Sequence, residues 1–141
     1  MSEADSHSKP TGRWTPDERF AVAELAHLLL TEGQRDSARA LLEGLVELAP
    51  DDLWSRMALA AALRALKHYD GAARQLDEAL RIDPQNLSAA VELGEVNLLR
   101  GQMQAARGCS AMAEYMLSQG GASEALKVRV QRLARVTAMS G

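Results

Sequence analysis

ALAAALRALKHYDGAARQLDEALRIDPQN, residues 58–86, contains a pattern that recurs along the chain at a step of 34 residues. At that step Leu59 aligns with Leu25 and with Leu93. A fixed period of this length is typical of a solenoid built from one helical-hairpin unit. Proteins of this kind act through a surface, so we expect the function to depend on exposed side chains. The other aligned residues are Ala26, Ala60 and Gly94; Ala38, Ala72 and Ala106; and Pro50 and Pro84.

The composition favours one helical domain without a strong electrostatic partner. Of 141 residues, 47% are hydrophobic but only 4% are aromatic, and Ala and Leu dominate. Both are good helix formers, and Ala lets helix axes approach closely. The net charge of −3 argues against a general nucleic-acid binder, which needs a basic excess.

Several features predict a cytoplasmic protein that does not enter a membrane. Cys109 is the sole cysteine, which excludes an internal disulfide and fits a reducing compartment. We expect neither a secretory signal nor a membrane-spanning segment, because long apolar runs are missing. Residues 1–14 are polar and are predicted to be a disordered tail. Within them, Trp14 either packs on the first helix or docks onto a partner or a second copy.

Capping and breaking residues predict seven helices. Thr15, Pro16 and Glu18 form a capping box with proline at the first helical position. Asp52 is expected to cap the third helix and Asn86 the fifth. A final helix is predicted over 123–138 after a Gly-Gly break, with its apolar face formed by Leu126, Val130, Leu133 and Val136.

The repeated unit resembles the tetratricopeptide repeat, which pairs two antiparallel helices in each 34 residues. The resemblance implies an all-α, right-handed solenoid of three helix-turn-helix repeats plus a C-terminal capping helix. Its domain would cover 15–138, with repeats at about 19–52, 53–86 and 87–120. The third repeat is degenerate, because Asn97 and Ser110 replace large apolar residues and Ser118 stands in place of proline. The residues of the second repeat that carry the resemblance are Leu59, Ala60, Leu63, Tyr69, Ala72, Leu76, Ala79 and Pro84.

In that family the first helix of each pair lines a concave groove. The carried-over groove is mostly apolar, and large apolar groups in a groove favour a bound partner segment, with Trp as a hot spot. The alternatives are that the tail or a second copy covers these residues, or that they are core. The predicted peptide-binding residues are Phe20, Ala23, His27, Leu30, Trp54, Met57, Ala61, Arg64, Val91, Glu95 and Leu98, with Glu92 beside them.

Two known groove types can be compared with this lining. Some family members clamp the C-terminal carboxylate of heat-shock chaperones with Lys, Asn and Arg. Here the aligned residues are Ala23, His27, Ala58, Ser88 and Glu92, which cannot hold a carboxylate. The chain is also similar to the translocator chaperones of bacterial type III secretion. The similarity lies in the size, the number of repeats and residues 93–119, LGEVNLLRGQMQAARGCSAMAEYMLSQ. That resemblance implies a small chaperone that keeps a translocator segment soluble, and a plain adaptor explains the residues almost as well.

The sequence predicts no enzyme, cofactor or metal site, because it lacks phosphate-loop, zinc-protease and serine-hydrolase motifs. Cys109 is expected to pack between helices, and His27 to be a surface residue. The basic residues Lys127, Arg129, Arg132 and Arg135 favour a solvated capping helix over a lipid or nucleic-acid surface. The alternative function is structural self-association, with a homodimer as one form.

Overall fold

The computed structural model describes residues 14–139, and every regular element in that range is a helix. All seven predicted helices are present. The predicted tail, apart from Trp14, lies outside the described residues. The helices are α2 (Pro16–Thr31), α3 (Arg35–Leu48), α4 (Leu53–Ala65), α5 (Tyr69–Ile82), α6 (Leu87–Leu99), α7 (Met103–Ser118) and α8 (Glu124–Met139).

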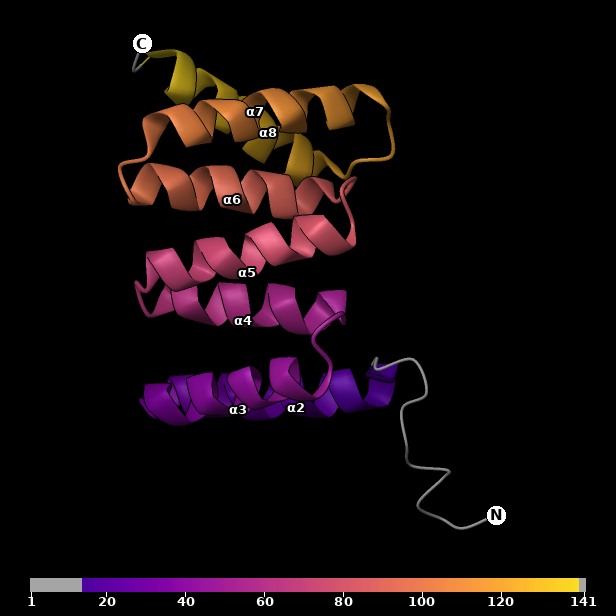
Figure 1. The fold of residues 1–141 in the computed structure, drawn as a ribbon, viewed down its shortest axis with the longest axis vertical. Helices are drawn as coiled ribbons and strands as arrows, with labels where there is room; N and C mark the ends of the chain where they lie inside the picture. Colours follow the sequence, from indigo (N-terminus) through magenta and orange to yellow (C-terminus); the bar gives the residue numbers. More distant parts are fainter. Residues whose placement is uncertain (1–13, 140–141) are drawn as a thin grey trace. The chain divides into compact units, whose positions relative to one another are not determined.

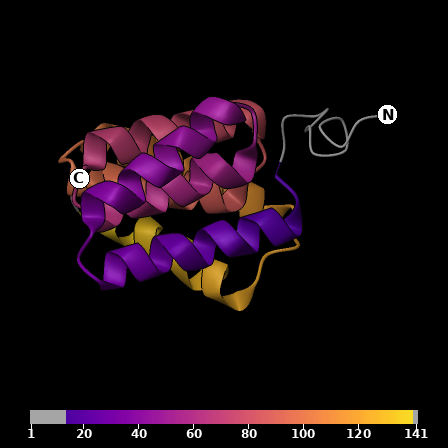
Figure 2. The same cartoon turned by 90° about the horizontal axis from the view of Figure 1, so that it is seen from below.

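The chain divides into two compact units, the first ending at Leu59 and the second beginning at Ala60. In the first unit, α2 and α3 lie side by side (Figure 2). They are joined by a tight turn in which Gly33 has a φ of 78°, a conformation that favours glycine. In the second unit, α6 lies between α5 and α7 (Figure 1). Helix α8 packs against both α6 and α7.

The predicted helix caps are confirmed. The Thr15 hydroxyl accepts from the Glu18 amide at 3.2 Å, and the Glu18 carboxylate accepts from the Thr15 amide at 2.8 Å. The Asn86 side chain accepts from the Ala89 amide at 2.9 Å. These bonds satisfy amides that have no partner within a helix, so they fix where α2 and α6 begin.

The small residues of the 34-residue pattern are buried where helices approach each other. Ala38, Ala72 and Ala106 are all fully buried. At Gly94 an added Cβ would clash with a methyl carbon of Leu133 and would lie 3.2 Å from the Cβ of Cys109. Glycine at this position therefore allows α8 to pack closely against α6.

Two predicted packing residues are exposed instead. Leu25 is 45% exposed, whereas its counterparts Leu59 and Leu93 are buried. No described helix of the first unit covers this side of α2. On α8, Val136 is exposed and Thr137 is buried in its place, where its hydroxyl donates to the Leu133 carbonyl at 2.9 Å. That hydrogen bond is what lets a polar residue be buried there.

Candidate functional site

An exposed, largely apolar face of α2 is the first candidate site. Seven residues of this helix line an open hollow of about 580 Å³, and we call them the α2 surface. Phe20 is 66% exposed, and Leu25 and Leu28 are exposed beside it. Apolar side chains gathered at one place on a surface are typical of a binding site. The α2 surface consists of Phe20, Ala23, Glu24, Leu25, His27, Leu28 and Thr31.

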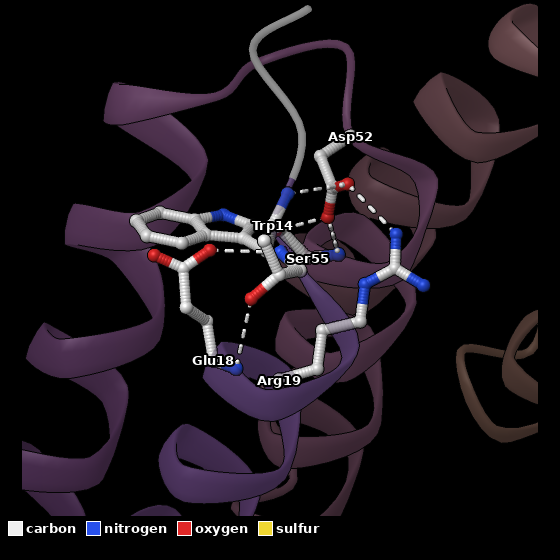
Figure 3. Close-up of polar contacts among 6 residues, drawn as sticks. Trp14, Glu18, Arg19, Asp52 and Ser55 are labelled. Carbon is white, nitrogen blue, oxygen red and sulfur yellow. Dashed lines mark hydrogen bonds and ion pairs between the residues drawn. The ribbon is translucent and has the colours of Figure 1, made fainter. Parts of the chain in front are cut away.

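A buried carboxylate holds the start of α2 in place. Asp52 is fully buried and caps α4, because its side chain accepts from the Ser55 amide at 2.9 Å and the Ser55 hydroxyl at 2.7 Å. Its other oxygen faces the Trp14 amide at 3.4 Å and the Arg19 guanidinium at 3.3 Å (Figure 3). One side chain thus attaches α2 to the beginning of α4. Trp14 is half-buried, in agreement with local packing at the first helix.

The second unit presents a charged surface formed by α4, α6 and α8. Glu95 of α6 accepts from Arg129 of α8 at 2.6 and 3.2 Å, and from Arg64 of α4 at 2.9 Å. Glu92, one turn earlier on α6, has an oxygen 3.9 Å from Arg129. We call these four residues the Glu95 cluster. Two carboxylates and two guanidinium groups leave the cluster with no net charge.

The two carboxylates of the cluster have opposite pKa shifts. Burial would raise the pKa of Glu95, but hydrogen bonds from Arg129 and Arg64 outweigh it and hold the pKa below its usual range. Burial raises the pKa of Glu92, and the nearby charge of Glu95 adds to that effect. Arg129 and Arg64 oppose the shift of Glu92 without cancelling it. Glu95 is therefore well compensated, whereas Glu92 is not.

The predicted groove residues do not all lie on a surface. Phe20, Ala23 and His27 are exposed on the α2 surface, whereas Leu30 is half-buried and outside it. The prediction that Val91 lines the groove is wrong, because this residue is fully buried in a core that includes Val130 of α8. The prediction left the first helix of the third repeat open, but α8 covers it there. Of the remaining predicted residues, Ala61 is exposed, and Trp54, Met57, Arg64, Glu95 and Leu98 are half-buried.

Sequence reasoning missed other members of both surfaces. Glu24, Leu25, Leu28 and Thr31 also line the hollow on α2. The repeat position of Leu25 predicts a core residue, and no local signal in the sequence indicates its exposure. Arg129 was predicted to face solvent, but it pairs with Glu95. Nothing in the spacing of the sequence indicates that pairing.

The basic character of α8 is partly neutralised within the protein. Lys127 pairs with Glu124 at 3.1 Å, and Arg129 with Glu95. Arg132 and Arg135 are exposed. Two exposed arginines on a helix without neighbouring aromatic groups make a weak nucleic-acid surface.

Cys109 lies in a buried polar contact between α6 and α7. It is 6% exposed, and Asn97 donates to its sulfur at 3.7 Å. Arg100 donates to Asn97 at 3.0 Å and to Asp70 at 2.9 Å, so the buried amide is satisfied. Burial raises the pKa of the Cys109 thiol, which disfavours the reactive thiolate. The predicted packing role of Cys109 is confirmed.

The described part of the chain has neither a membrane-spanning helix nor a cluster of metal ligands. Between residues 14 and 139, no helix combines the length and apolar character needed to cross a bilayer. Within the same range, no three His, Cys, Asp or Glu side chains lie together as metal ligands would.

The repeat pattern identifies the family. Two tetratricopeptide repeat profiles match the chain, over residues 29–77 and 57–109. Together they run from residue 29 to residue 109, more than half of the 141 residues. The chain belongs to the tetratricopeptide repeat family. No protein of curated function matches the sequence significantly.

Solved structures share this all-α tetratricopeptide solenoid fold. SycD, a type III secretion translocator chaperone of Yersinia enterocolitica, is 18% identical over 90% of this chain and 88% of its own, with a TM-score of 0.76. PcrH of Pseudomonas aeruginosa, in complex with the chaperone binding region of PopD, is 19% identical over 90% and 96%, with a TM-score of 0.76. The TPR2B domain of yeast Sti1, in a pHsp70 complex, is 15% identical over 87% and 98%, with a TM-score of 0.73. At these identities the likeness shows a common fold.

Proposed function

We propose that this protein is a peptide-binding module that holds an apolar segment of another protein. The single observation that supports this most is the α2 surface, where Phe20, Leu25 and Leu28 are exposed beside an open hollow. Burying exposed apolar side chains against a partner is favourable, by about 25 cal/mol for each Å² of apolar surface removed from water. An apolar segment is the ligand that gains most from such a surface.

The relatives of known structure give this proposal a more specific form. SycD is a translocator chaperone, and PcrH was solved with the chaperone binding region of PopD. We extend that role to this chain as a proposal: a small cytoplasmic chaperone or adaptor in a bacterial secretion assembly. A heat-shock co-chaperone role is disfavoured, because Glu92 lies at a clamp position and would repel a carboxylate.

Selection from a phage-displayed library of random dodecapeptides tests the proposal and does not require the partner to be identified. Wild type should enrich apolar peptides, and the variant Phe20→Glu/Leu28→Glu should not. Leu99→Glu is the matched control, because Leu99 is exposed on α6 in the second unit. Sedimentation of the same proteins shows whether the variant also alters self-association. Equal enrichment by wild type and the α2 variant would remove the α2 surface from the binding site.

A further inference from the structure

The arginines of the Glu95 cluster donate their hydrogen bonds to Glu95 and not to Glu92. Glu95 receives three hydrogen bonds, two from Arg129 and one from Arg64. The same Arg129 nitrogen that lies 2.6 Å from Glu95 is 3.9 Å from Glu92, too far for a hydrogen bond. Among residues 14–139, no side chain or amide donates a hydrogen bond to Glu92. Both arginines are thus held by Glu95, and the acceptors of Glu92 remain open.

Glu92 is also placed where an ionised carboxylate is unfavourable. Its side chain is 21% exposed, so it has lost most of its water but can still be reached from solvent. A desolvated carboxylate without a hydrogen-bonding partner lowers the stability of the folded protein. Burial raises its pKa, which agrees with this account. Groups that oppose folding in this way are typical of functional sites, where the missing partner comes from a ligand.

We propose that Glu92 binds a basic side chain, Lys or Arg, of a partner protein at this surface of the second unit. The inference rests on the proposed function, because it takes this protein to bind a protein segment, and it adds a charge-selective contact in the second unit. An ammonium or guanidinium group supplies the hydrogen-bond donors that Glu92 lacks and adds a positive charge beside it. An acidic side chain would instead add a third carboxylate beside Glu92 and Glu95, which lie one turn apart on α6.

The dodecapeptide selection distinguishes this inference from the proposed function when wild type is compared with Glu92→Gln. Glutamine keeps the shape of the side chain and removes its charge. Wild type should enrich peptides that contain Lys or Arg, whereas Glu92→Gln should enrich peptides without that preference. The exposed glutamate Glu114 of α7 provides the control variant Glu114→Gln, which should retain the preference. Circular dichroism checks that all three proteins are folded.

Affinities of selected peptides then give the size of the effect. A peptide with Lys should bind wild type about tenfold more tightly than its Lys→Met analogue, as expected for one charge-assisted bond, and both peptides should bind Glu92→Gln equally. If wild type and Glu92→Gln enrich apolar peptides with the same fraction of Lys and Arg, the inference is wrong and the proposed function still stands. Enrichment of acidic peptides would also overturn it, since Arg64 would then be the recognition residue. If wild type enriches no peptides, both the inference and the proposed function are wrong.

Discussion

Ala23 and Val91 occupy the same position in the first and third repeats, and so do His27 and Glu95. Ala23 and His27 are exposed on α2, whereas Val91 is buried and Glu95 is ion-paired. The difference comes from α8, which packs on α6 and contributes both an apolar side chain and an arginine. Equivalent repeat positions are therefore exposed or buried according to whether a further helix packs on them.

Removing an anchor of α8 should have the largest effect on stability. Leu133 is 2% exposed and packs over Gly94, so Leu133→Ala leaves a cavity and should lower the free energy of unfolding by about 2–5 kcal/mol. Leu28→Ala on the α2 surface should lower it by less than about 0.5 kcal/mol, because that side chain is exposed. Urea unfolding measures both. Equal losses would contradict the contrast between a closed and an open end.

Loss of the Asp52 carboxylate should have the next largest effect. Asp52→Ala removes the cap of α4 and the contacts to Trp14 and Arg19, and should lower the free energy of unfolding by about 2–3 kcal/mol. Asp36→Ala, an exposed acidic residue in the first turn of α3, is the control and should change it by a few tenths of a kcal/mol. Thermal unfolding followed by circular dichroism distinguishes these outcomes, and similar melting temperatures would remove the anchoring role.

Glu95→Gln should have a smaller effect that depends on pH. The substitution weakens the hydrogen bonds of two arginines, and should lower the free energy of unfolding by about 1–2 kcal/mol at neutral pH. Because the pKa of Glu95 is lowered by folding, its contribution is present above the usual glutamate pKa and is lost as pH falls through the folded-state pKa. Urea unfolding at several pH values tests this. A constant difference between wild type and variant at all pH values would contradict it.

The smallest expected effect has the opposite sign. Folding raises the pKa of Glu92, so the ionised group reduces stability as pH rises through the folded-state pKa. Glu92→Gln should therefore increase the free energy of unfolding at neutral pH, by less than about 1 kcal/mol. The gain should disappear at a pH below the usual glutamate pKa. A loss of stability at neutral pH would show that the ion pair with Arg129 outweighs the cost of burying Glu92.

The period in the sequence was sufficient to predict the helices and most of the core. Ala38, Ala72 and Ala106 are buried as predicted, because close helix crossings tolerate only small side chains. The caps at Thr15, Asp52 and Asn86 depend on residues next to one another in the sequence, so local patterns identify them.

The candidate site was less predictable, because it depends on contacts between distant residues. Arg129 and Glu95 are 34 residues apart, and their pairing results from how α8 packs on α6. The burial of Val91 has the same cause. The exposure of Leu25 could not be read from its repeat position, since burial there requires a helix on the other side. A repeat pattern specifies contacts within a unit, whereas the ends depend on particular neighbours.

The contacts of Asp52 predict that two helix starts open together. Its carboxylate accepts hydrogen bonds from the amides of both Trp14 and Ser55, which lie at the starts of two different helices. When the side chain of Asp52 swings away, both amides lose their acceptor in the same event. They should therefore exchange their hydrogens with solvent at similar rates, although they are far apart in the chain. One buried oxygen pair would then make two helix ends fray as a single unit.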